Sequence, residues 1–308
     1  MGTRKLGAAG RIALALACIA GGSPVAADEG GDDPVPVTGI APSSEDIVIT
    51  GRGLDALDRY VDELTTTPND TQLARWNDHI CPRAVGVTPA LNAYLAERIA
   101  LIAQQMRIPV ERGSCRANIL VVVTEEADAF AHLLFQRHPK LFGAYGSGRP
   151  PAEAVDALLR PSPVRWLNAS SWGNGQGAPV VDGNKNFVYS MSRLQETTRQ
   201  NATLSLVIVD ATKLEGVTWG GLSSYIAMVS LARPSPSAAP SSAPTILSLF
   251  RNRDAKRPTP AALTRWDREY LKGLYSAKAN ASLSAQRSQI RVQMKRELSR
   301  DTVQPSGD

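Results

Sequence analysis

The segment "WGGLSSYIAMVSLARP" (Trp219–Pro234) decides how the rest of the chain is interpreted. It carries no charge before Arg233 and opens on two adjacent glycines. At helical spacing Ser223, Ala227 and Ser230 share one face, because residues i, i+4 and i+7 align. A wide apolar stripe lies beside that face, made of Leu222, Tyr225, Ile226 and Val229. The pattern therefore predicts a helix whose small face, which also takes in Ser224, either packs tightly inside the domain or borders a groove.

The remaining pattern predicts one mixed α/β domain over residues 46–300 with a helical C-terminal third. Continuous apolar runs at 117–124 and 202–210 are typical of buried strands, and further strands are expected at 46–50, 164–172 and 178–190. A helix over 88–106 begins with Thr88 as N-cap and Pro89 at the first helical position. Apolar periodicity predicts the other helices at 54–64, 125–139, 150–160, 244–250, 264–276 and 285–298.

The first 27 residues have the pattern of a secretory signal peptide. Basic residues near the start precede an apolar run from Ile12 to about Gly21, and small residues end at Ala27. We therefore expect an exported protein, periplasmic or extracellular, with no transmembrane segment in the mature chain. Lipid attachment at Cys18 is the alternative to soluble export. Residues 28–45 are acidic and rich in Pro and Gly, which predicts a disordered leader, and residues 301–308 are expected to be a disordered tail.

Two cysteines, Cys81 and Cys115, remain after the expected cleavage. In an exported protein an isolated pair is more often a disulfide than two free thiols. Closing a loop of about 35 residues stabilises a fold by roughly 3 to 4 kcal/mol in the chain-entropy model. No CxxC is present, so this pair is interpreted as structural.

The charge of the chain is modest and unevenly distributed. The net charge of +5 falls to about +2 without the three basic residues of the expected signal peptide, which argues against a nucleic-acid partner. Residues 251–300 hold thirteen bases and four acids. This segment is interpreted as a solvated helical surface, or as a surface that contacts an anionic envelope polymer or lipid.

Common catalytic motifs are missing from the sequence. The glycines of "GNGQG" (173–177) lie between strand-like segments, which indicates a connecting loop instead of a phosphate cradle at a helix start. Neither G-x-S-x-G nor S-x-x-K occurs. The only histidines are His79, His132 and His138, and a serine triad needs a histidine base. The spacing of six between His132 and His138 does not place two metal ligands on one helical face.

Two further candidate sites remain open. Glu125 and Glu126 follow a buried strand, and together with His79 and Asp210 they could form the site of a secreted hydrolase. The structural alternative is that the two glutamates offset a helix dipole. Five aromatic residues could form a sugar- or peptide-binding face or could fill the core, namely Trp166, Trp172, Trp219, Tyr145 and Tyr189.

Residues 217–275 resemble a set of secreted alphaproteobacterial proteins that are distantly similar to zincin-like metallopeptidase domains. The resemblance rests on three segments, "SSYIAMVS", "PTILSLF" and "LTRWDREYLKGLYS". In active domains of that type the first segment is a helix bearing H-E-x-x-H-x-x-G. Here Ser223 stands at the position of the first histidine and Ser224 at that of the glutamate. Ala227 stands at the second histidine and Ser230 at the glycine.

The resemblance implies a zincin-like scaffold without catalysis, metal or cofactor. Serine and alanine are not donors that hold zinc, whereas His, Cys and carboxylates are. We therefore expect an exported binding or structural module of the cell envelope, whose partner is an envelope polymer or another exported protein.

Overall fold

A computed structural model describes residues 51–67, 71–138, 152–174, 196–238, 240 and 243–300. All of them belong to one compact unit within residues 42–308. The expected signal peptide, leader and tail lie outside the described residues, as do the strands expected at 46–50 and 178–190.

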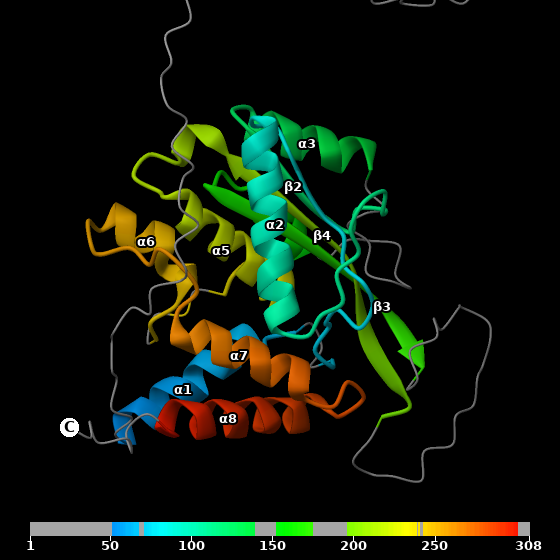
Figure 1. The fold of residues 1–308 in the computed structure, drawn as a ribbon, viewed down its shortest axis with the longest axis vertical. Helices are drawn as coiled ribbons and strands as arrows, with labels where there is room; N and C mark the ends of the chain where they lie inside the picture. Colours follow the sequence, from blue (N-terminus) through cyan, green and yellow to red (C-terminus); the bar gives the residue numbers. More distant parts are fainter. Residues whose placement is uncertain are drawn as a thin grey trace, which may run out of the picture. The chain divides into compact units, whose positions relative to one another are not determined.

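The centre of the fold is a four-stranded sheet with the order β1-β2-β4-β3 (Figure 1). Strand β2 (Ile119–Thr124) pairs in parallel with β1 (Pro82–Val85) on one side and with β4 (Thr198–Asp210) on the other. Strand β3 (Val164–Asn174) runs antiparallel to β4 and forms an edge. β3 extends into the sequence expected to be a loop, because Gly173 and Asn174 still pair with Arg199 and Thr198.

Helices cover both faces of this sheet, and the alternation of side chains along the strands explains why. On β4, Val207 and Val209 face the larger core with α2 (Pro89–Gln105) and α5 (Trp219–Leu231). Leu206 and Ile208 point the other way, into a smaller core with α3 (Ala127–Arg137) and α4 (Ala152–Leu159). The buried strand predicted at 202–210 is therefore apolar toward both helical layers.

The helical C-terminal third predicted from the sequence is present. It contains α6 (Leu249–Asp254), α7 (Arg265–Ser276) and α8 (Leu283–Arg300), and α8 lies beside α7 and α1 (Gly51–Leu64) in Figure 1. Arg291 and Lys295 of α8 form ion pairs with Asp58 of α1, and Arg291 also pairs with Asp62. Part of the basic character of 251–300 is thus used in holding α8 against α1.

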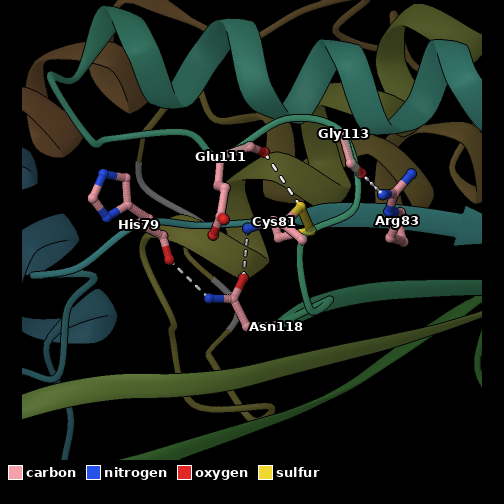
Figure 2. The surroundings of a disulfide bond; sticks show 7 residues. His79, Cys81, Arg83, Glu111, Gly113 and Asn118 are labelled. Carbon is pink, nitrogen blue, oxygen red and sulfur yellow. Dashed lines mark hydrogen bonds between the residues drawn. A yellow bond between two sulfur atoms is a disulfide. The ribbon is translucent and has the colours of Figure 1, made fainter.

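The disulfide joins the start of β1 to the segment before β2. Cys81 and Cys115 have a Cα–Cα distance of 6.1 Å, which is within the usual range for a disulfide. Figure 2 shows Asn118 next to it, accepting a hydrogen bond from the backbone N–H of Cys81 (2.7 Å) and donating one to the carbonyl of His79 (2.9 Å). These contacts fix the β1 end of the sheet.

Just after β1 the backbone requires a glycine. Gly86 has φ +101°, and a Cβ placed there would lie 1.8 Å from the carbonyl oxygen of Val123. No L side chain fits so close to the neighbouring strand. The chain can therefore leave β1 and enter α2 only because residue 86 has no side chain.

Candidate functional site

The helix predicted from "WGGLSSYIAMVSLARP" is α5, and it lies inside the core. Thr218 caps it, its hydroxyl accepting a hydrogen bond from the N–H of Gly221 (3.1 Å). The four candidate groove residues, Ser223, Ser224, Ala227 and Ser230, are each 0 % exposed. The groove interpretation of this face is therefore wrong. The small side chains allow neighbouring elements to approach, and these elements exclude solvent from the helix.

The paired glycines at the start of α5 serve the same close packing. A Cβ on Gly220 would lie 3.1 Å from the carbonyl oxygen of Ala261, and one on Gly221 would lie 3.1 Å from that of Pro260. The backbone of the loop before α7 thus packs directly against the backbone of the first turn of α5. Two side chains donate hydrogen bonds to the other end of α5. The Trp76 indole N–H donates to the carbonyl of Ser230 (2.8 Å), and the Tyr275 hydroxyl donates to the carbonyl of Leu231 (2.9 Å).

The serine hydroxyl groups of α5 make few hydrogen bonds to the described residues. Ser223 donates to the carbonyl of Gly220 one turn earlier (2.9 Å). The hydroxyls of Ser224 and Ser230 are buried and have no hydrogen-bond partner among the described residues. An isolated hydroxyl in the core supplies neither a zinc ligand nor an activated nucleophile, because no base lies within hydrogen-bonding distance.

The alternative acidic site does not assemble as one cluster. Glu125 and Glu126 follow β2 at the carboxyl end of the sheet, where Asp210 also lies, since Thr124 pairs with Asp210. His79 lies at the opposite end, bonded through its carbonyl to Asn118, the residue before β2. At about 3.3 Å per residue, the length of β2 separates the two ends by roughly 20 Å. The predicted convergence of all four side chains is therefore wrong.

Asp210 itself has a structural task. It is 4 % exposed, forms an ion pair with Lys213 (2.8 Å) and caps the short 3-10 helix η3 (Ala211–Lys213) by accepting from the N–H of Thr212 (3.1 Å). Burial raises the pKa of Asp210, but the hydrogen bonds from Lys213 and Thr212 outweigh it and hold this pKa below its ordinary value. Asp210 is therefore an ionised cap. Glu125 and Glu126, in contrast, are exposed.

The other histidine and aromatic candidates are also dispersed. His132 and His138 are exposed on α3 and directly after it. Trp166 is buried and its indole N–H donates to the carbonyl of Pro234 (3.1 Å), so it belongs to the core. Trp172 pairs with Gln200 near the start of β4, whereas Trp219 begins the helix that follows the end of β4. These three tryptophans do not form one binding face, and Tyr145 and Tyr189 lie outside the described residues.

Across the described ranges, no three His, Cys, Asp or Glu side chains are grouped so that they could hold a metal ion. The helices of the same ranges are all too short or too polar to cross a membrane.

A buried carboxylate outside the predicted sites lies at the start of α7. Asp267 is 0 % exposed and accepts hydrogen bonds from the hydroxyls of Tyr60 (2.8 Å) and Thr245 (2.6 Å). The N–H groups of Ile246 (2.8 Å) and Thr264 (2.9 Å) donate to its second oxygen. Burial raises the pKa of Asp267, and the hydrogen bonds oppose that rise without cancelling it. The signal for it was the T-x-x-D spacing of Thr264 and Asp267, which is that of a capping box.

Asp267 connects three parts of the helical region and so acts as a structural junction. Its partners come from α1, from the segment that opens the short helix η4 (Ile246–Ser248), and from the N-cap of α7. The Asp267 carboxylate is occupied by these hydrogen bonds and closed to solvent, so no substrate reaches it.

Comparison with known proteins found no match among family models, curated proteins or solved structures. The zincin-like resemblance therefore rests on the residues of 217–275 alone.

Proposed function

We propose that this chain is an exported, non-catalytic binding or structural module with a zincin-like scaffold whose metal positions have been replaced by small residues. The observation that carries the proposal is the complete burial of Ser223, Ser224, Ala227 and Ser230 on α5. A hydrolase must admit both water and substrate to its catalytic helix, and this helix is buried from Gly221 to Leu231. The chemistry of the four residues agrees, since none of them is a side chain that holds zinc.

The packing around α5 supports a scaffold role for this helix. Trp76, Tyr275 and Asn168 each donate a side-chain hydrogen bond to a carbonyl in its last turns, at Ser230, Leu231 and Val229. Tyr225 packs edge-on against both Trp166 (6.3 Å) and Phe250 (5.2 Å between ring centroids). These contacts tie α5 to the sheet, α6 and α7, which suits a helix that organises the domain.

Metal content and peptidase activity of the purified full chain test the proposal. We expect no stoichiometric zinc by elemental analysis after dialysis against trace zinc, and no cleavage of a peptide library with or without added metal. One tightly bound metal ion per chain, or cleavage that a chelator abolishes, would contradict it.

Export is a separate part of the proposal and has its own test. Expressed with its own N-terminus in a Gram-negative host, the chain should be recovered from the periplasm or medium with Asp28 as its first residue. Recovery of an unprocessed chain from the cytoplasm would contradict export, and a lipid-modified Cys18 would contradict soluble export. Neither result bears on the metal content.

A further inference from the structure

Arginine side chains gather where the segment before β1 crosses the start of β4. Arg75 lies in that segment, and its backbone carbonyl accepts a hydrogen bond from the N–H of Ala202 (2.8 Å). Arg75 is also paired with Asn201 through a parallel bridge, and Arg199 is two residues earlier on β4. Residues two apart on a strand point to the same face, so Arg199 and Asn201 share one side of β4.

Two asparagine side chains hold these arginines next to each other. The Nε of Arg75 donates to the side-chain oxygen of Asn77 (3.1 Å), and the amide nitrogen of Asn77 donates to the side-chain oxygen of Asn201 (2.7 Å). The Nε of Arg199 donates to that same oxygen of Asn201 (3.0 Å). One continuous chain of hydrogen bonds therefore connects the Nε atoms of the two guanidinium groups and leaves their Nη atoms outside this chain.

Neither guanidinium has a carboxylate partner among the described residues. Arg75 uses Nη1 to bond the carbonyls of Leu274 (2.7 Å) and Ala277 (2.5 Å) at the end of α7. Its Nη2, and both Nη atoms of Arg199, make no hydrogen bond to the described part of the chain. Both side chains are partly exposed. Burial lowers the pKa of Arg75, and the neighbouring Arg199 charge lowers it further while Tyr275 opposes this.

A third cation contacts Trp76, the residue that follows Arg75. Arg233 stacks over the Trp76 ring at 5.5 Å, and its Nη atoms donate to the carbonyls of Leu204 (3.1 Å) and Ala169 (2.6 Å). Its Nε is buried without a hydrogen-bond partner among the described residues. Among the described residues, carbonyl dipoles and an aromatic ring are thus what balance the charge of Arg233.

We propose that Arg75 and Arg199 form a binding site for an oxyanion of the phosphate class, with Arg233 adding to the local positive potential. Two guanidinium groups held together repel each other, and a doubly charged anion between their outer nitrogens removes this repulsion. Planar guanidinium donors match the oxygen atoms of a phosphate group, and such charge-assisted hydrogen bonds are among the strongest in proteins. The site is independent of the proposed loss of zinc chemistry on α5.

Calorimetric titration of the purified full chain with inorganic phosphate at pH 7.5 tests the site. Sodium chloride holds the ionic strength constant, because exposed charges are screened by salt. We expect one phosphate per chain, and Arg199→Gln to weaken binding by roughly tenfold or more, since it removes a charged pair of donors. Arg199→Lys should recover part of the affinity.

Arg112→Gln is the matched control. It removes the same charge from an exposed arginine that pairs with Glu97 (3.1 Å), away from the junction. Its phosphate affinity should stay within about twofold of the unmodified chain, because distant exposed charges contribute little. Absence of binding to the unmodified chain, or equal weakening by Arg112→Gln and Arg199→Gln, would overturn the proposal. The first result would exclude the site and the second would reduce it to non-specific charge attraction.

Discussion

The α5 helix and the start of α7 both bury polar side chains completely, but they do so in opposite ways. On α5 the hydroxyls of Ser224 and Ser230 have no hydrogen-bond partner among the described residues. At α7 the Asp267 carboxylate receives hydrogen bonds from Tyr60, Thr245, Ile246 and Thr264. The difference teaches that the serines of α5 matter for their small size, whereas Asp267 matters for its hydrogen bonds.

Removal of the Asp267 carboxylate should have the largest effect on stability. Asp267→Ala leaves several buried donors unsatisfied, and we expect it to lower the free energy of unfolding by about 3 to 5 kcal/mol. Chemical denaturation of the full chain measures this. Asp254→Ala, which removes an exposed partner of Arg253, is the control and should change stability by about 0.5 kcal/mol or less. A loss of similar size in both variants would contradict the role of Asp267 as a junction.

Two neighbouring tyrosines separate the effect of one hydrogen bond from that of ring packing. Tyr60 and Tyr270 are both fully buried, with ring centroids 5.8 Å apart. The Tyr60 hydroxyl donates to Asp267, whereas the Tyr270 hydroxyl has no partner among the described residues. Tyr60→Phe should therefore destabilise the fold by about 1 to 3 kcal/mol, and Tyr270→Phe should be neutral or stabilising. If both variants lost the same free energy of unfolding in denaturation, the hydrogen bond from Tyr60 to Asp267 would not contribute to stability.

Asp210 provides a carboxylate whose pH dependence can be predicted. Its pKa in the folded chain is held below the ordinary value by Lys213 and Thr212, despite burial. The contribution of the Asp210 carboxylate to the free energy of unfolding is therefore fully present above its pKa in the unfolded chain, about 3.9. This contribution is lost as the pH falls through the lower pKa that Asp210 has in the folded chain. Asp210→Asn should be less stable than the unmodified chain at pH 7, with the difference shrinking below about pH 4. A difference that stays constant from neutral to acidic pH would contradict the ion pair.

The smallest effects are expected on α5 itself. Ser224→Ala removes a buried hydroxyl that bonds to none of the described residues, so the free energy of unfolding should stay within about 0.5 kcal/mol or increase. Ser223→Ala removes the hydrogen bond to Gly220 and serves as the comparison, with an expected loss of about 0.5 to 1.5 kcal/mol. A larger loss for Ser224→Ala than for Ser223→Ala would show that Ser224 has a polar partner after all.

Much of the fold could be predicted from the sequence because it depends on local signals. Apolar periodicity located α2, a continuous apolar run located β4, and the Thr88 and Pro89 pattern placed the start of α2. The isolated cysteine pair indicated the disulfide between Cys81 and Cys115. In each case the determining residues are close in sequence, or the chemistry leaves a single pairing.

The candidate sites could not be predicted in the same way, because they depend on contacts between distant segments. Whether Ala227 borders a groove depends on which elements cover α5, and the spacing of small residues fits both outcomes. Asp267 meets Tyr60 across 207 positions of sequence. Likewise, Arg75 and Arg199 are brought together by the bridge between Arg75 and Asn201 and by the hydrogen bonds of Asn77. No local pattern contains that information.

The most direct test of the central claim is the accessibility of the small face of α5. Ala227→Cys introduces a thiol at a position that is 0 % exposed, and Val292→Cys introduces one on α8 at a position that is 63 % exposed. Labelling with a thiol reagent under native conditions, corrected for the unmodified chain, compares them. If α5 is packed as described, Val292→Cys reacts at once and Ala227→Cys reacts only when the chain is unfolded. Rapid labelling of native Ala227→Cys would mean that a cleft opens beside this helix, and the account of α5 as a purely structural helix would be wrong.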